Sequence, residues 1–303
     1  MRFFIITLLL LIVQSIFGQH IIVLGTAQDG GFPHIGCQNE CQRAHRNPDF
    51  AKYVTSLALV DPKTKQWWLF EATPDMDKQL QYFQTLTHKE YPYLPEGIFI
   101  THAHIGHYTG LMSLGREALG ANKVKVYALP RMIDFLKTNG PWSQLIDLEN
   151  ISPVILPTDL PVVIGEDLTV EAFTVPHRDE FSETAGFKIS KRLKSYLFIP
   201  DIDKWRKWDR SIVELLDQRE IDYAFLDATF YQEGELPNRA MDKVPHPFVV
   251  ESMALFDKES RALKRKIQFI HFNHTNPLLF DKKTQIDLMK EGYGIAEQGK
   301  TYY

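Results

Sequence analysis

Cysteine is scarce in this chain of 303 residues, which contains only two. A framework of several disulfides, which small secreted domains use in place of a large core, is therefore excluded. Positive charge is not in excess either, because 34 Lys and Arg residues face 38 Asp and Glu residues, for a formal charge of -4. That balance argues against nucleic acid as a partner. Hydrophobic residues make up 44% of the chain and charged residues 24%, as in globular proteins rather than disordered or multi-span membrane proteins.

The one long hydrophobic run lies at the N-terminus. After Arg2, residues 3–17 are almost entirely apolar, and Gly18 follows them. One positive charge, a short apolar run and a small residue at its end predict a signal peptide over residues 1–18. We therefore expect a secreted or periplasmic protein that has no membrane span after cleavage. An uncleaved anchor is the alternative, because apolar residues resume at Ile21.

Short β-rich runs alternate with amphipathic stretches along residues 19–303, and no repeat or linker divides them, which predicts a single domain. The expected strands are 21–25, 56–60, 67–71, 97–101 and 124–128, then 168–174, 184–189, 195–199, 223–226 and 267–271. The expected helices are 74–86, 109–119, 131–137, 205–218, 248–256 and 284–290. Two sheet-forming halves with helices outside predict an α/β fold, a four-layer αββα sandwich.

Three histidines follow the strand expected at 97–101, in the spacing H-x-H-x-x-H. Residues two apart on an extended segment point the same way, so His102 and His104 can reach one metal ion. His107 lies where the chain turns into the next helix, so it can serve a second ion nearby. Imidazole binds zinc, iron, copper and nickel, and three clustered histidines favour a metal site over isolated surface or core histidines.

Further candidate ligands occur in the second half of the chain. They are His177, Asp201 and His271, and each of them follows an apolar run. Residues that end strands of one sandwich can project from the same edge into one cleft. We therefore expect ligands from both halves to converge.

The order of these residues resembles the metallo-β-lactamase superfamily, whose pattern is H-x-H-x-D-H followed by a histidine, a metal-bridging aspartate and a final histidine. The resemblance covers most of the chain after residue 18, and it implies a hydrolase with one or two zinc ions. Metal-bound hydroxide would attack an ester, a phosphodiester or a similar bond of a small-molecule substrate. The implied ligands are His102, His104 and His177 for the first metal, His107 and His271 for the second, and Asp201 between the two.

One position departs from the superfamily pattern. The aspartate of H-x-H-x-D-H is Gly106 here, which removes a carboxylate from the second metal site. One expectation is therefore a single metal or a weakly held second one. Asp29, in the early loop 28–31, is a candidate replacement ligand.

Two segments resemble the PqqB-like branch of the superfamily. One is 25–33 followed by Cys37 and Cys41, and the other is 271–277, with the sequence HFNHTNP. PqqB is an accessory protein of pyrroloquinoline quinone biosynthesis, and PqqB proteins tend to lack several superfamily histidines that this chain retains. The branch implies an alternative function, a non-haem iron oxygenase that holds Fe2+ and acts on a tyrosine-derived precursor.

Two further alternatives remain open. H-x-H after a strand also begins the metal site of amidohydrolase (β/α)8 barrels. In those barrels the last metal ligand in the sequence is usually an aspartate, and one ligand is a lysine, whereas the last candidate ligand here is His271. A non-catalytic metal-binding protein is the other alternative.

Two segments resemble the tRNA-processing and phosphodiesterase members of the superfamily. They are 226–230, with the sequence LDATF, and 245–247, with the sequence PHP. The resemblance implies that His246 is a general acid for the leaving group and that Asp227 is also catalytic. Support of the metal ligands or helix capping is the alternative for both residues, and His274 is either an alternative ligand or such a supporting residue.

Cys37, Cys41 and His45 are spaced four apart, which places them on one face of a helix. They could form a partial metal site or, through the two cysteines, a local disulfide. Three ligands make a poor structural zinc site, so the sequence favours structural thiols or a disulfide.

Overall fold

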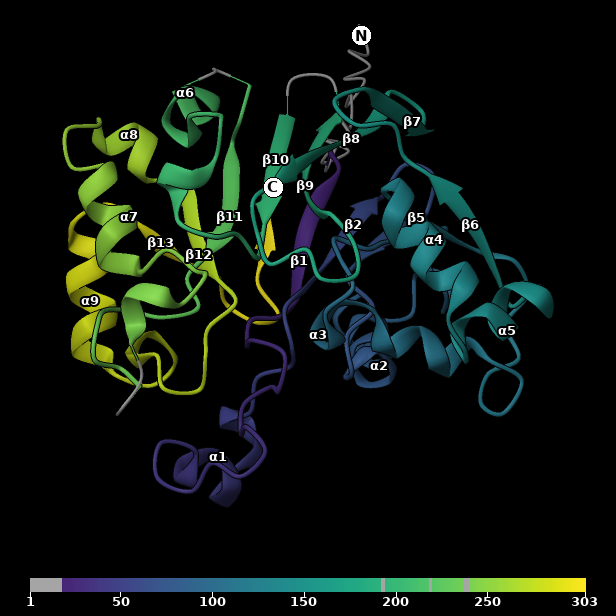
Figure 1. The fold of residues 1–303 in the computed structure, drawn as a ribbon, viewed down its shortest axis with the longest axis horizontal. Helices are drawn as coiled ribbons and strands as arrows, with labels where there is room; N and C mark the ends of the chain where they lie inside the picture. Colours follow the sequence, from purple (N-terminus) through teal and green to yellow (C-terminus); the bar gives the residue numbers. More distant parts are fainter. Residues whose placement is uncertain (1–17, 192–193, 218–219, 237–239) are drawn as a thin grey trace, which may run out of the picture.

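Two seven-stranded β-sheets pack face to face in the computed structural model, which describes residues 18–191, 194–217, 220–236 and 240–303 (Figure 1). The signal peptide expected over 1–18 lies outside the described residues except for Gly18. The first sheet contains, in spatial order, β14 (Thr301–Tyr302), β1 (His20–Gly25), β2 (Ser56–Asp61), β3 (Gln66–Phe70), β4 (Gly97–Phe99), β5 (Val124–Ala128) and β6 (Ile151–Ile155). The second contains β13 (Gly294–Ile295), β12 (Ile267–Ile270), β11 (Tyr223–Asp227), β10 (Lys194–Ile199), β9 (Thr184–Lys191), β8 (Leu168–Val175) and β7 (Pro161–Gly165).

Strand residues alternate between two hydrophobic layers. In β1, Ile21 and Val23 belong to the core between the sheets, whereas Ile22 and Leu24 belong to the core under the helices. This alternation follows from the two-residue period of a strand, and it explains why such strands are apolar on both faces. The arrangement confirms the four-layer αββα sandwich expected from the sequence.

Helices cover the outer face of each sheet. In α4, Pro130 occupies the first turn, and Met132, Ile133 and Leu136 form the buried stripe against the first sheet. The helices on the first sheet are α2 (Met76–Leu86), α4 (Pro130–Thr138) and α5 (Trp142–Asp147). Those on the second are α6 (Ile212–Asp217), α7 (Val249–Leu255), α8 (Arg261–Lys264) and α9 (Lys282–Lys290). The two other α-helices among the described residues are α1 (Gln42–Arg46) and α3 (Ile105–Tyr108), and short 3-10 helices span Pro48–Phe50, Thr109–Leu114, Trp205–Lys207, Met241–Lys243 and Pro277–Leu279.

Two of the expected helices are wrong, because neither is a continuous α-helix in the structure. Of residues 109–119, only Thr109–Leu114 are helical, as a 3-10 helix, and turns follow from Gly115, because glycine at 110 and at 115 disfavours the α-helix. In the described part of the helix expected over 205–218, a 3-10 helix (Trp205–Lys207) is followed by α6 (Ile212–Asp217). The interruption contains Trp208, whose indole N–H donates a hydrogen bond to the Thr174 carbonyl over 3.0 Å.

The long loop between β1 and β2 carries α1, which lies away from both sheets in Figure 1. Cys37 and Cys41 form a disulfide in this loop, which confirms the favoured alternative. The alternative expectation, a metal site formed by Cys37, Cys41 and His45, is wrong. The two sulfur atoms are bonded to each other, and His45 Nε2 donates a hydrogen bond to the Cys37 carbonyl over 2.8 Å. His34 of the same loop stacks on His274 with ring centroids 4.4 Å apart.

None of the helices in the described part of the chain is both long enough and apolar enough to cross a membrane.

Candidate metal centre

The candidate ligands lie at one end of the sandwich, where strands of both sheets finish. Strand β3 is parallel to β4, and β11 is parallel to both β10 and β12, so their carboxyl ends share an edge in each sheet. The six residues expected to bind metal are therefore brought together from distant parts of the chain. The side chains that follow strand ends are Glu71 after β3, His102, His104 and His107 after β4, His177 after β8, Asp201 after β10, Asp227 at the end of β11 and His271 after β12.

His102, His104, His177 and Asp201 form the first compact group. One possible ligand atom from each lies within 4.8 Å of the others. His102 Nε2 is 2.7 Å from His104 Nδ1, and His177 Nε2 is 3.4 Å from Asp201 Oδ2. The His177 side chain is fully buried, yet neither of its ring nitrogens has a hydrogen-bond partner. Because a buried, unpartnered polar atom is unfavourable, this group fits a bound cation.

Asp29, His107 and His271 form the second group. Asp29 Oδ1 lies 3.4 Å from His107 Nε2 and 3.9 Å from His271 Nε2, and none of these atoms has a hydrogen-bond partner. Burial would lower the pKa of His107, but Glu71 and Asp29 outweigh burial and raise that pKa well above its usual value. A metal ion that binds His107 would therefore displace a proton.

Asp201 lies between the two groups. Its Oδ2 atom is 3.5 Å from His102 Nε2, 3.4 Å from His177 Nε2 and 3.6 Å from His107 Nε2. The residue is only 3% exposed. This is the position that a carboxylate must occupy if it is to contact ions in both groups.

Glu71 and Thr101 orient two of the histidines. Glu71 is fully buried, and its Oε1 atom lies 3.2 Å from His107 Nδ1 and accepts a 2.6 Å hydrogen bond from the Thr101 hydroxyl. Thr101 Oγ1 is also 2.9 Å from His102 Nδ1. Engaging Nδ1 in this way leaves the Nε2 lone pair of each ring for a metal. Sequence reasoning missed Glu71, although an acidic residue directly after a buried strand was an available signal.

Thr229 orients His271 in the same way as Thr101 orients His102. Its hydroxyl donates to Asp227 Oδ1 over 2.7 Å and lies 2.9 Å from His271 Nδ1. The ring N–H therefore donates to Thr229, and Nε2 is left without a partner. The sequence singled out Thr229 only as part of the segment 226–230, and it gave this residue no role of its own.

The expected catalytic pair, His246 and Asp227, lies beside Asp201. His246 Nδ1 is 2.9 Å from Asp227 Oδ2 and 3.1 Å from Asp201 Oδ1. Burial alone would lower the pKa of His246, but the two carboxylates outweigh it and raise the pKa to about 10. Asp201, Asp227, His246 and His271 also offer ligand atoms within 4.8 Å of one another. His246 and Asp227 are therefore close enough to take part either in catalysis or in ligand support.

Burial and neighbouring charges set the protonation of His102, His177 and Asp201 in the first group. Burial, with His107 nearby, holds the pKa of His102 well below its usual value, and burial also lowers the pKa of His177. Burial would raise the pKa of Asp201, but His177 and His246 more than offset it and hold the pKa well below its usual range. Neutral imidazoles and an ionised carboxylate are the forms that bind metal ions.

Two residues of the centre have a strained backbone. Glu71 has a φ of 75° and His271 a φ of 68°, in the left-handed region that residues with a side chain rarely adopt. Such conformations cost roughly 1–3 kcal/mol each and persist where the surrounding structure holds them, often at functional sites.

Charged side chains surround His104 at the rim of the centre. Glu180 Oε2 lies 2.8 Å from His104 Nε2, and Arg178 Nη2 lies 3.2 Å from His104 Nδ1. The Arg178 side chain is 49% exposed. A polar group of a substrate that approaches the centre from this side would meet both charges.

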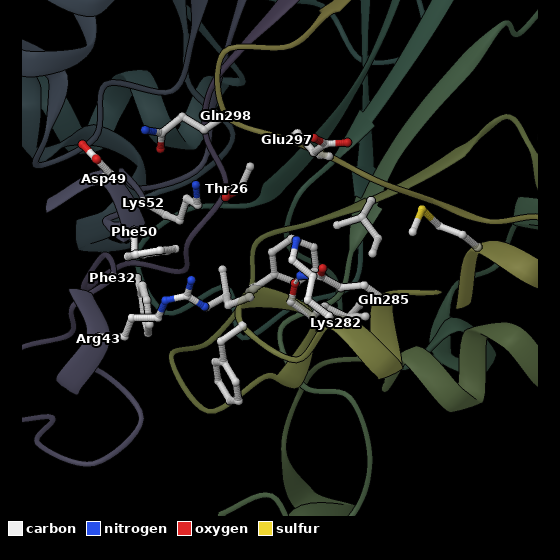
Figure 2. A pocket seen from close by; sticks show the side chains of 17 residues that line it. Thr26, Phe32, Arg43, Asp49, Phe50, Lys52, Lys282, Gln285, Glu297 and Gln298 are labelled. Atoms are coloured by element: carbon white, nitrogen blue, oxygen red, sulfur yellow. Dashed lines mark hydrogen bonds between the residues drawn. The ribbon is translucent and has the colours of Figure 1, made fainter. Parts of the chain in front are cut away.

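A separate cavity of about 390 Å³ lies outside the centre (Figure 2). Phe32, Arg43 and Lys52 line it from the loop after β1, and Lys282 and Glu297 line it from the C-terminal part. None of the six expected ligands is among its lining residues. We assign the chemistry to the histidine groups, because buried ligand atoms without partners converge there and not at this cavity.

Residues 66–272 match the beta-lactamase superfamily domain. The chain is also 26% identical to the coenzyme PQQ synthesis protein B of Gluconobacter oxydans over 306 aligned residues, which cover 93% of this chain and 97% of that protein. These similarities confirm the resemblance to the superfamily and to its PqqB-like branch.

Solved structures show the same fold. The zinc-bound PqqB of Methylobacterium extorquens aligns with a TM-score of 0.73 and 20% identity, over 94% of this chain and 99% of that one. A diphosphatase from the PhnP family aligns with a TM-score of 0.67 and 19% identity, over 94% and 96% of the two chains. The expected metallo-β-lactamase type of sandwich is thereby confirmed.

Proposed function

The chain belongs to the beta-lactamase superfamily, and from this membership and its histidine groups we propose that it is a metal-dependent hydrolase. The observation that carries the proposal is the position of Asp201, whose Oδ2 lies within 3.6 Å of the Nε2 atoms of three histidines. A buried set of imidazoles around one carboxylate, with ring nitrogens left unpartnered, is unfavourable without a cation.

The ligand sets follow the two groups of the centre. Nitrogen and carboxylate ligands in this mixture suit zinc, with Fe2+ as the alternative. The zinc in the PqqB relative of the same fold supports that choice. When bound, zinc supplies a coordinated water with a pKa of ~7 and a positive charge that polarises the scissile bond. His102, His104 and His177 would hold one ion, His107 and His271 the other, and Asp201 would contact both.

His246 supplies the proton for the leaving group in this proposal. Its Nδ1 faces Asp227 at 2.9 Å, so Nε2 is the ring atom that can donate a proton to a substrate. Asp227 keeps the ring oriented and favours its protonated form. A positioned acid of this kind accelerates bond cleavage by roughly 100- to 10,000-fold.

The substrate class is an ester or phosphodiester of a small molecule. Two observations favour a phosphoryl substrate: Arg178 stands at the rim of the centre, and the chain shares its fold with a PhnP-family diphosphatase. Guanidinium groups bind phosphate oxygens well, because their donors match the spacing of two oxygens.

The test is hydrolysis by the zinc-loaded chain of bis(p-nitrophenyl) phosphate, p-nitrophenyl acetate and a chromogenic lactam, with and without EDTA. We expect zinc-dependent turnover that is highest on the phosphodiester and is lost in His102→Ala. The matched control is His88→Asn, which changes an exposed histidine whose φ of 52° asparagine tolerates. Full metal content and full turnover in folded His102→Ala would refute the site, and bound metal without any turnover would refute the hydrolase.

A second candidate function is that of a PqqB-like protein, an iron-dependent oxygenase or accessory protein of quinone biosynthesis. The similarity to coenzyme PQQ synthesis protein B over nearly the whole length of both chains favours it. The metal in the chain as isolated and oxygen uptake separate the two functions. Two zinc ions per chain with no oxygen uptake support the hydrolase, whereas one iron per chain with oxygen uptake on a tyrosine-derived compound supports the oxygenase.

We also propose that residues 1–18 are a cleaved signal peptide, that 19–303 form one domain, and that the protein is secreted or periplasmic. The Cys37–Cys41 disulfide supports this location, because disulfides persist mainly in oxidising compartments.

A further inference from the structure

Gly106 and Asp29 occupy complementary space. A Cβ atom added to Gly106 would overlap the Asp29 Oδ1 atom and would come within 2.8 Å of the Asp29 Cα. Side chains do not approach one another that closely, so no residue with a Cβ fits at 106 while Asp29 keeps this position. The φ of Gly106 is not positive, so the glycine is required for space and not for backbone conformation.

Backbone hydrogen bonds hold the Asp29 loop against the second sheet. The Gln28 N–H donates to the Phe272 carbonyl over 2.8 Å, and the Phe272 N–H donates to the Thr26 carbonyl over 2.9 Å. Asp29 is therefore fixed relative to His271, the residue next to Phe272. Such anchoring is what a ligand on a loop needs in order to keep its geometry.

The contacts of Asp29 do not form an ordinary ion pair. A charge-assisted hydrogen bond between imidazole and carboxylate spans about 2.7–2.9 Å. Asp29 Oδ1 instead lies 3.4 Å from His107 Nε2 and 3.9 Å from His271 Nε2, and all three atoms lack a hydrogen-bond partner. Both histidine side chains are fully buried. Three unpartnered atoms that face one another at these distances fit a shared cation.

We propose that Asp29 supplies the carboxylate ligand of the second metal site and that position 106 is glycine in order to admit it. The carboxylate that the superfamily pattern carries inside its histidine motif comes here from the loop after β1. The inference rests on the metal centre of the proposed function and adds the identity of its missing ligand. The chain then binds two ions despite Gly106, through Asp29, His107 and His271 at the second site.

The first test is zinc content, measured by plasma mass spectrometry after zinc loading and gel filtration. We expect two zinc ions per chain for the unmodified protein and about one for Asp29→Ala and Asp29→Asn. Asp29→Asn is nearly isosteric, so it separates loss of charge from a folding defect, which circular dichroism also monitors. The matched control is Glu40→Ala, which removes an exposed carboxylate from the same loop and keeps two ions. Two ions in the Asp29 variants, or one ion in both unmodified and variant chains, would overturn the proposal.

A double-mutant cycle tests the link between the two positions. Gly106→Ala places a Cβ against the Asp29 carboxylate, so it alone should lower the zinc content as far as Asp29→Ala does. In the Asp29→Ala background, whose second site already lacks its carboxylate ligand, Gly106→Ala should cause no further loss of zinc. If Gly106→Ala alone leaves two tightly bound zinc ions, glycine at position 106 is not needed for Asp29 to bind the second ion.

Zinc counting does not depend on turnover, so this inference and the proposed function can fail separately. A chain that binds a second zinc through Asp29 but hydrolyses nothing would refute only the hydrolase. A chain that hydrolyses its substrate with one zinc, whether or not Asp29 is present, would refute only the inference.

Discussion

The Nδ1 atom of His107 lies 3.2 Å from Oε1 of Glu71, and neither side chain is exposed to solvent. A buried carboxylate at this distance holds the imidazole in the orientation that turns Nε2 toward Asp201. Glu71 itself adopts a positive φ, so the backbone after β3 is distorted where this carboxylate is placed.

We predict that Glu71→Gln weakens zinc binding at the His107 site about 10- to 100-fold, the usual effect of removing a carboxylate that orients a ligand. Competition with a chromogenic chelator measures the affinity. Glu90→Gln is the control, because Glu90 is an exposed acid paired with Lys65. Equal zinc affinity in both variants would show that Glu71 does not orient His107.

Removal of metal should destabilise the folded chain. Free zinc at 100 times its Kd stabilises a protein that binds it only when folded by about 2.7 kcal/mol, which corresponds to a shift in Tm of roughly 4–5 °C for a chain of 303 residues. Thermal unfolding with EDTA and then with excess zinc measures the shift. His102→Ala should respond less than the unmodified chain. A Tm that does not respond to either treatment would contradict a metal centre in the folded state.

The effect of replacing His246 on kcat should depend on the leaving group of the substrate. His246→Asn should lower kcat roughly 100- to 10,000-fold for an alkyl phosphodiester, whose alkoxide needs a proton. The effect on bis(p-nitrophenyl) phosphate should be far smaller, because nitrophenolate leaves without protonation. Equal losses on both substrates would instead assign His246 a role in metal support.

The pH profile should report the carboxylates beside His246. Asp227 and Asp201 raise the pKa of His246 to about 10, so the imidazole remains protonated through neutral pH and loses its proton as the pH rises through that value. Activity that uses this proton should therefore fall on the alkaline side. Asp227→Asn removes one negative charge, lowers the pKa and moves the alkaline limb of kcat to lower pH. If the alkaline limb of kcat stayed at the same pH in Asp227→Asn, His246 would not be the group whose deprotonation lowers the activity.

A buried ion pair links the two sheets away from the centre. Lys191 Nζ of β9 lies 2.6 Å from Asp61 Oδ2 of β2, with side chains 9% and 2% exposed. Lys191→Met leaves the Asp61 charge buried and unpaired, which should lower the free energy of unfolding by about 3–5 kcal/mol, as measured by urea denaturation. Lys188→Met on the same strand removes a pair with the exposed Glu220 and should cost at most about 1 kcal/mol. A similar small loss in both variants would contradict this account.

Processing of the N-terminus is also open to direct measurement. Full-length chain expressed in a Gram-negative host should appear in the periplasmic fraction with an intact mass that begins at Gln19, because the predicted cleavage follows Gly18. Recovery of the uncleaved chain from the membrane fraction would support the anchor alternative.

Local patterns in the sequence were enough to predict much of this architecture. β5 (Val124–Ala128) has the bounds expected from its run of apolar and β-branched residues, and the layers follow from the strand period. The motif His102-x-His104-x-x-His107 marked the centre, because nearby histidines after a buried strand are recognisable without knowledge of the fold. The edge strands β6 and β7 were missed, since each contains a proline, which weakens the prediction of a strand, and most of their residues are only partly buried.

The relations between distant residues were decided only by the tertiary structure. The sequence shows Gly106 as the absence of a ligand and offers Asp29 only as a candidate replacement, without showing that the two positions meet. The loop after β1 packs against α3, and the Asp29 carboxylate occupies the space that a side chain at position 106 would need. Glu71 likewise became part of the centre only where β3 and β4 lie side by side. Local spacing determines which residues can bind a metal, but contacts across the two sheets determine which of them meet, because the ligands follow strands that lie far apart in the sequence, namely β4, β8, β10 and β12.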